Sequence, residues 1–266
     1  MIEVVEPRLW VPKYPLLHIL CLKAPPTVAL PGREWYLYGD EMGNPTLDEQ
    51  AGWFCYAFLA VRADFHELYK KALKEAFWAT TEKPPTIQAL QQALAPTKAR
   101  VVVSYLNLKH PDIRERLKAH WEARRLDARS RLGEQAPTNA NLIWMQAFLA
   151  AYLEVVRQGP NIEVMEKIHV RYDQKSLKSR EYEILQREFS ERLPQVFPMF
   201  LGEGPIPRAA SFKDAGDKNP FIRVADRIVR EAYEQLRNTD QTSLPRWIQC
   251  MDSTFGLESI LRNRSA

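Results

Sequence analysis

The sequence predicts an α/β protein in which one mixed β-sheet is flanked by α-helices. Two observations support this fold class. Segments with strand patterns alternate along the chain with segments of helical periodicity, and two neighbouring strand segments are joined by a short loop. Of the 266 residues, 45% are hydrophobic and 26% are charged. That composition can bury a substantial core and excludes a mainly disordered chain.

The predicted strands differ in their patterns. Gly52–Arg62 is apolar almost throughout, which is typical of a strand buried on both faces. Ile162–Asp173 alternates apolar and polar residues, which indicates one buried and one polar face. The remaining strand segments are Trp35–Asp40, Arg100–Leu108, a region within Pro194–Phe212 and a short stretch at Leu16–Leu22.

Helices are predicted from apolar stripes and from residues that favour helix ends. Asp64 is expected to cap one helix, and Pro111 to open another at its first turn. The expected helices are 64–78, 87–94, a basic helix from 111, 139–158, 176–193 and 219–237. These elements divide the chain into a proline-rich lead-in (1–33), one domain (34–240) and a tail (241–266) that is helical from Pro245.

Features of membrane and secreted proteins are not evident in the sequence. No apolar run approaches the roughly 20 residues that a membrane-spanning helix needs, and the first residues lack the basic region of a secretory signal. Three widely spaced cysteines (Cys21, Cys55 and Cys250) argue against a disulfide framework and against a thiolate zinc site. We therefore expect a cytoplasmic protein with reduced thiols and no membrane partner.

Positive charge is concentrated between residues 114 and 131. Seven basic residues stand against three acidic ones there, and the difference of +4 equals the net charge of the whole chain. With Trp121 inside the run, the segment fits a helix that binds nucleic acid. The alternative is a solvated helix face with internal ion pairs. In the first interpretation, the residues that contact nucleic acid are Arg114, Lys118, Arg124, Arg125 and Arg129.

Three aspartates occupy positions that suggest metal binding or catalysis. Asp226 falls within the apolar stripe of the helix 219–237, which suggests that it binds a cation. The alternatives are a salt bridge to a nearby Arg, or a stripe wide enough to place Asp226 at its edge. Asp40 ends a strand and precedes Glu41, a placement typical of a metal or catalytic site and also of a turn. Asp173 ends the alternating strand on its polar face, where it either joins such a site or caps the next helix.

Carboxylates gathered at one place repel each other and need a cation, and ligand sets made only of oxygen suit Mg²⁺ or Mn²⁺. The segment Tyr36–Pro45 contains Gly39-Asp40-Glu41-Met42-Gly43, Lys167–Asp173 is a strand that ends in Asp, and Asn219–Asp226 closes on an Ala-Asp pair. In this order the three segments resemble the domain-of-unknown-function 3800 family, in which Asp-Glu-Ser-Gly follows a short apolar strand. The resemblance covers about residues 35–237.

The resemblance implies the ribonuclease H-like superfamily, with a mixed sheet and a carboxylate cluster that binds divalent metal. It assigns Asp40, Asp173 and Asp226 as metal ligands and adds Glu41 to the catalytic group. Met42 stands where the family has Ser. The family often has a His or an acid just after the third strand, and the residues available there are His110, Asp112 and Glu115.

These observations predict a metal-dependent nuclease that hydrolyses phosphodiesters in nucleic acid with Mg²⁺ or Mn²⁺. The alternative is a catalytically degenerate component of the same fold that binds nucleic acid or protein. His169 shares a strand face with Asp173, so it either supports the site or is a solvated strand residue.

Overall fold

The computed structural model describes residues 33–78, 85–95, 99–119, 122, 139–157, 165–173, 208–216 and 218–254. Its strands are β1 (Glu34–Gly43), β2 (Trp53–Arg62), β3 (Arg100–Asn107), β4 (Lys167–Tyr172), β5 (Arg208–Asp214) and β6 (Ile248–Asp252). Its helices are η1 (Ala63–Phe65), α1 (His66–Trp78), α2 (Ile87–Leu94), α4 (Asn139–Arg157) and α7 (Pro220–Thr239), with a further helix at 111–119.

The six strands form one sheet in the order β5-β4-β1-β2-β3-β6. β1, β2 and β3 are an antiparallel meander, and β4 and β5 continue the sheet beyond β1 as parallel strands. β6 runs parallel to β3 at the other edge. The predicted α/β fold class is confirmed: the sheet is mixed and is flanked by helices.

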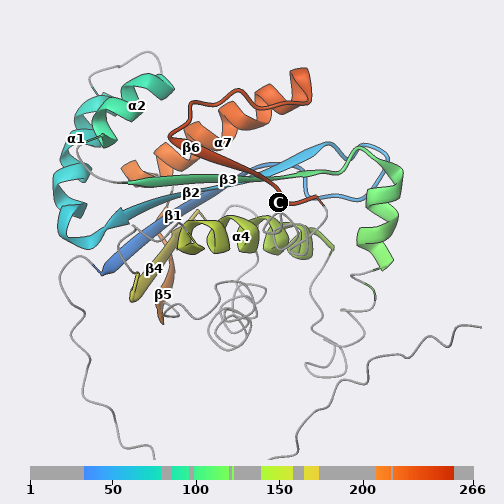
Figure 1. Cartoon of the computed structure of the whole chain (residues 1–266), viewed down its shortest axis with the longest axis horizontal. Helices are drawn as coiled ribbons and strands as arrows, with labels where there is room; N and C mark the ends of the chain where they lie inside the picture. The colour runs from blue at the N-terminus through green and yellow to red at the C-terminus, as the bar shows by residue number, and fades with distance from the viewer. Residues whose placement is uncertain are drawn as a thin grey trace, which may run out of the picture.

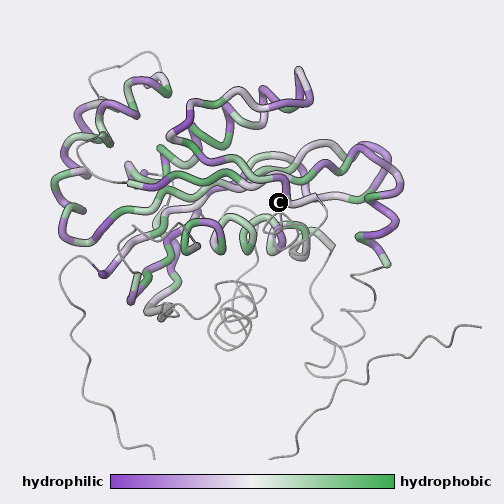
Figure 2. Tube along the Cα trace, in the orientation of Figure 1, coloured by the Kyte–Doolittle hydropathy of each residue, from purple (hydrophilic) through white to green (hydrophobic). Residues whose placement is uncertain are grey.

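Helices cover both faces of the sheet (Figure 1). α4 packs on one face, which we call the α4 face, and α7 with α1 and α2 packs on the other, the α7 face. Each face has its own hydrophobic core. β2 lies between both cores and is buried along nearly its whole length, as its apolar sequence predicts. Figure 2 shows α4 as mainly hydrophobic, whereas α7 mixes hydrophobic and hydrophilic residues.

Both ends of α7 are stabilised by side chains. The Asn219 side chain accepts a hydrogen bond from the backbone N–H of Phe221 at 2.9 Å, and Pro220 occupies the first turn. Asp240 ends the helix in the left-handed conformation with φ of 55°. Its carboxylate accepts hydrogen bonds from Lys109 at 2.6 Å and from the Trp53 indole at 3.3 Å. These bonds tie the end of α7 to the sheet.

Two local predictions are wrong. Asp64 lies inside the 3-10 turn η1 and bonds Arg62 at 3.0 Å, while α1 begins at His66. The segment after Pro245 forms strand β6 and not a helix. Without β6, β3 would be an edge strand with unpaired backbone groups, and pairing with β6 satisfies them. The sheet therefore includes residues beyond 240. The segments predicted at 16–22 and 176–193 lie outside the described residues.

No helix in the described ranges is long and apolar enough to cross a membrane. Cys55 and Cys250 are free thiols in the structure. Cys21 lies outside the part of the chain that the structure describes.

Candidate functional site

The sheet register places Asp40 beside Asp173. β1 and β4 are parallel, with Gly39 opposite Tyr172, so Asp40 and Asp173 are the next residues along the two strands. Adjacent strands lie about 4.8 Å apart, and residues at equivalent positions share a face. Both carboxylates are buried, with 5% of Asp40 and 9% of Asp173 exposed. Two acids from distant parts of the sequence thus lie next to each other at one end of the sheet.

The pKa of the Asp40 carboxyl is raised to about 7. Burial is the largest cause, and the negative charges of Glu41, Asp226 and Asp173 add to it. The backbone N–H of Glu41 donates to Asp40 Oδ1 at 2.9 Å and opposes the shift. The other three predicted acids therefore lie close enough to Asp40 to raise its pKa. We call Asp40, Asp173 and Asp226 the carboxylate corner.

Asp226 lies at the edge of the apolar stripe of α7 and not within it. Ile222, Ala225 and Val229 are buried, whereas the Asp226 side chain is 38% exposed. Arg230, one turn later on the helix, donates to Asp226 Oδ1 at 3.1 Å. The prediction of a carboxylate inside the stripe is thus wrong, and the alternative of an arginine pair at the edge is confirmed.

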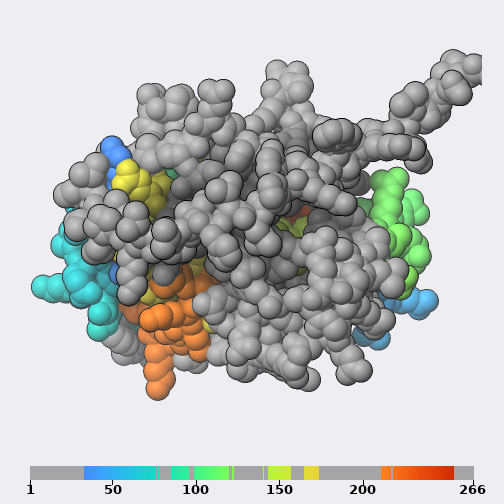
Figure 3. All heavy atoms as spheres, turned by 90° about the horizontal axis from the view of Figure 1, so that it is seen from below, coloured from blue at the N-terminus to red at the C-terminus, as the bar shows by residue number. Residues whose placement is uncertain are grey.

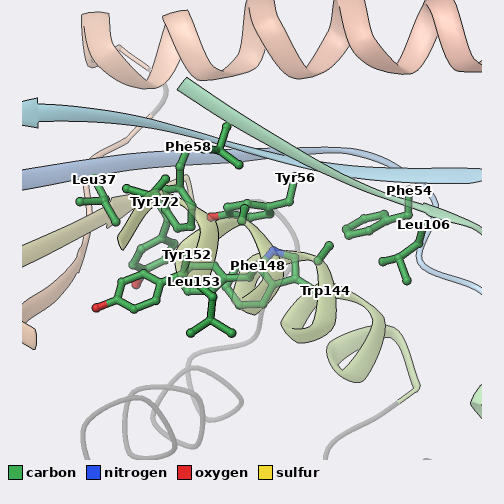
Figure 4. Close-up of a cluster of buried hydrophobic side chains, with 14 of the residues drawn as sticks. Leu37, Phe54, Tyr56, Phe58, Leu106, Trp144, Phe148, Tyr152, Leu153 and Tyr172 are labelled. Carbon is green, nitrogen blue, oxygen red and sulfur yellow. The ribbon is translucent and has the colours of Figure 1, made fainter. Parts of the chain in front are cut away.

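Glu41 points to the opposite face from Asp40, because successive side chains alternate along a strand. The Trp144 indole of α4 donates to Glu41 Oε2 at 3.3 Å. Tyr56 stands opposite Glu41 on β2, fully buried against Trp144 and Phe148 (Figure 4). Burial raises the pKa of its hydroxyl, and the charge of Glu41 raises it further. Within the described residues, no group forms a hydrogen bond with this hydroxyl.

Glycine is needed at positions 39 and 43, on either side of Asp40, for two different structural reasons. A Cβ on Gly39 would overlap the Tyr56 hydroxyl and the Phe58 ring, so the residue before Asp40 must be small. Gly43 has φ of 108°, a conformation that favours glycine, where β1 ends. The close approach of Tyr56 to Gly39 depends on the pairing of β1 with β2, which no local pattern contains.

The corner fits a divalent cation in its donor set. It offers only oxygen ligands. Burial, and to a smaller extent the charges of the neighbouring acids, disfavour the ionised form of Asp40, and a bound cation would offset both effects. Asp40 and Asp173 could each supply a carboxylate oxygen to the cation. Asp226 could supply a third if its hydrogen bond to Arg230 were broken. As the side chains stand, no three His, Cys, Asp or Glu residues in the described part of the chain are placed to hold one metal ion.

The residues considered for a fourth ligand lie elsewhere. Asp40 pairs with Ala57 of β2, which in turn pairs with Val103 of β3. His110, Asp112 and Glu115 come after the end of β3. They lie beyond the sheet and two strands away from β1. The structure therefore does not bring them to the carboxylate corner.

The basic helix is described only in its first part. The Arg114 guanidinium donates to the backbone carbonyls of Leu108 at 3.3 Å and Lys109 at 3.0 Å. Lys118 pairs with Glu115 at 2.9 Å. These contacts agree with the alternative of internal pairing. Arg124, Arg125 and Arg129 lie outside the described residues.

His169 is part of a hydrogen-bonded network and is not a solvated strand residue. Its Nδ1 bonds the Ser211 hydroxyl at 2.7 Å, and its Nε2 bonds the Glu34 carboxylate. Its side chain is 13% exposed and stacks on the Tyr36 ring. Its neighbour Arg171 lies on the same face of β4 and was not predicted as a site residue from the sequence. The signal was present, since Lys167, His169 and Arg171 alternate with buried residues.

No family model matches the chain, and no curated protein matches it. Among solved structures, it is similar to a chain of the PCNA:RNase HII complex from Archaeoglobus fulgidus, with 15% sequence identity and a TM-score of 0.40. That alignment covers 87% of each chain.

Proposed function

We propose that the chain is a divalent-metal-dependent nuclease in which Asp40, Asp173 and Asp226 hold Mg²⁺ or Mn²⁺. The observation that carries this proposal is the burial of Asp40 within β1 and of Asp173 beside it, directly after the end of β4. Two adjacent buried carboxylates are costly in a metal-free protein, and a cation offsets that cost. The proposal includes membership of the domain-of-unknown-function 3800 family.

The residues of the corner have separate roles in this proposal. Asp40 and Asp173 supply the buried oxygens, and Asp226 supplies one from the opposite element, α7. Glu41, held by Trp144, adds negative charge behind Asp40 and favours binding of a cation. A bound divalent ion would supply water activation and stabilisation of the negative charge that develops in phosphodiester cleavage.

One observation favours the alternative of a degenerate binding component. Asp226 already has a cationic partner in Arg230, and the described residues do not form a three-ligand metal cluster. If Arg230 replaces the metal permanently, the protein keeps the fold and has no hydrolytic activity. The two proposals differ in whether Asp226 releases Arg230 when Mg²⁺ or Mn²⁺ is added.

Cleavage assays with Asp40→Asn and Asp173→Asn test the proposed activity. Labelled single-stranded and duplex DNA and RNA are incubated with Mg²⁺ or with Mn²⁺, and the products are separated by size. We expect the wild-type protein to cleave at least one substrate, and each variant to be slower by about 100-fold or more, because water activation and charge stabilisation are lost together.

Asp214→Asn is the matched control. Asp214 is the last residue of β5, at the same end of the sheet as Asp173, which follows β4. It pairs with Tyr172, so its side chain lies on the opposite face of the sheet from Asp173. It is exposed, and it accepts a backbone hydrogen bond from Gly216 at 2.8 Å that Asn can also accept. Equal cleavage by all three variants and the wild type would contradict the assigned ligands. A wild-type protein that binds nucleic acid without cleaving it would support the alternative.

A further inference from the structure

The α7 face of β1, β4 and β5 carries rows of polar and aromatic residues that lead to the carboxylate corner. One row contains Tyr36, His169 and Ser211, which are paired across the three strands. The next row contains Tyr38, Arg171 and Lys213, and the row after it begins with Asp40 and Asp173. Rows on one face of a sheet are about 6.6 Å apart. Arg171 and Lys213 are therefore one row from the proposed metal ligands.

Arg171 is held in place by three contacts. Its guanidinium lies over the Tyr36 ring at 5.4 Å, and its Nη1 donates to the Ser211 hydroxyl at 2.8 Å and to the Val170 carbonyl at 2.9 Å. Both hydrogen bonds use the same nitrogen, and within the described residues no contact occupies Nε or Nη2 as a donor. A guanidinium fixed in this way loses little conformational entropy when it binds an anion.

The Tyr36 ring is fixed in turn by its neighbours. His169 stacks against it with ring centroids 4.8 Å apart, and His66 from α1 lies at the same distance. The two imidazoles are hydrogen-bonded, His169 to Ser211 and Glu34, and His66 to Tyr38. The support under Arg171 is therefore a continuous network from four elements.

The charges of this face are complementary to a polyanion. Lys213 is exposed, the Lys167 side chain is 38% exposed, and Arg171 is partly exposed. Glu34 is the only acid of the strand rows before the carboxylate corner among the described residues, and it is paired with Lys167 and His169. β5, which carries Lys213, is the edge strand and reaches the surface in Figure 3.

We propose that Arg171 and Lys213 bind backbone phosphates of a nucleic-acid strand that runs along β4 into the carboxylate corner. This inference rests on the proposed nuclease function and specifies its substrate-binding surface. The planar fork of arginine matches a phosphate bidentately, and the exposed Lys213 adds a second charge in the same row. The positive row beside the corner positions the substrate backbone, and the acids hold the cation.

Salt-dependent binding tests the assignment. A fluorescent single-stranded oligonucleotide, as DNA and as RNA, is titrated in EDTA with the wild type, Arg171→Gln, Lys213→Gln and the control Arg237→Gln. Arg237 is an exposed arginine in the last turn of α7, so the control removes the same charge elsewhere. Each phosphate contact that is lost lowers the slope of log affinity against log salt by about 0.7 for a single strand.

We expect Arg171→Gln and Lys213→Gln each to lower the slope by about 0.7 and the affinity by about 10-fold, and Arg237→Gln to leave the slope unchanged. Lys213→Gln guards against a folding defect, because Lys213 is exposed. Tyr36→Leu keeps the charge of Arg171 but removes its support, so it should weaken binding by about 2- to 5-fold with no change in slope.

Slopes for Arg171→Gln and Lys213→Gln that equal the slope for Arg237→Gln would overturn the proposal, even where Asp40→Asn abolishes cleavage as expected. The reverse result is also distinct. Reduced slopes in a protein that never cleaves with Mg²⁺ or Mn²⁺ would support the binding surface and contradict the nuclease function alone.

Discussion

The helix at 111–119 and the polar face of β4 gather positive charge in different ways. In the helix the basic residues are close in sequence, and two of the described ones already have partners: backbone carbonyls for Arg114 and Glu115 for Lys118. On the sheet, Arg171 and Lys213 come from segments about 40 residues apart, and cross-strand pairing places them in one row beside Asp173. The second arrangement is adjacent to the carboxylate corner, and the first is not.

The difference has a physical origin. Residues three or four apart on a helix are neighbours, so a charged run tends to neutralise itself through local pairs. Alternate residues on a strand share a face, and parallel register adds the equivalent residues of the next strand. A dense run of charge in the sequence is thus weaker evidence for a binding surface than alternating charges on adjacent strands.

The largest expected effect compares two exposed helix ion pairs, Asp226–Arg230 in α7 and Glu115–Lys118 in the basic helix. Asp226→Asn and Glu115→Gln should each change the free energy of unfolding by less than about 0.5 kcal/mol in metal-free buffer. Only Asp226→Asn should lower metal-dependent cleavage, by about 100-fold or more. Thermal melts and cleavage rates measure both quantities. Similar activity of the two variants would remove Asp226 from the site.

The second prediction concerns pH and Asp40. In the folded protein its pKa is about 7, above the ordinary value of 3.8, so the folded state holds a proton that the unfolded state releases. Without metal, the stability that this proton provides falls as pH rises from about 4 and is fully lost above about 7. Asp40→Asn should remove this dependence and raise the stability at pH 8 by about 2–4 kcal/mol.

Urea denaturation in EDTA across pH 4 to 8 measures the stability of Asp40→Asn. Asp214→Asn, at the exposed end of β5, is the control and should follow the wild-type profile. Parallel pH profiles for Asp40→Asn and the wild type would mean that the pKa of Asp40 is not raised in the folded protein.

The smallest expected effect concerns the helix alone. Arg114→Gln loses the hydrogen bonds to Leu108 and Lys109 and should destabilise the protein by about 1 kcal/mol. It should leave the salt slope of oligonucleotide binding unchanged, whereas Arg171→Gln lowers it. A slope lowered by about 0.7 in Arg114→Gln would show that this helix also contacts phosphates and would end the contrast between the two regions.

Much of the fold could be predicted because its strands have strong local patterns. The apolar run of β2 and the alternation of β4 are properties of short windows, and both are confirmed. The β6 strand could not be predicted in the same way, because its pairing with β3 is a non-local contact. Asp226 was misplaced for a related reason: an edge position and a core position differ by less than one helical step, and tertiary packing decides between them.

The candidate site could be predicted in part. Asp40 and Asp173 both end predicted strands, so parallel strands would bring them together, as the register does. The tight packing of Tyr56 beneath Gly39 and the row of Arg171 with Lys213 depend on which strands are neighbours. That information becomes available only when the sheet order is known.

The most direct test of the account is a crystal of the wild-type protein soaked in Mn²⁺ and measured for anomalous scattering. We expect a peak within about 2.0–2.3 Å of carboxylate oxygens from both Asp40 and Asp173, with Asp226 turned from Arg230 toward it. Asp40→Asn crystals should lose the peak. An ordered corner with no peak, or a peak held only by acids outside Asp40, Asp173 and Asp226, would contradict the assignment of this corner as a metal site.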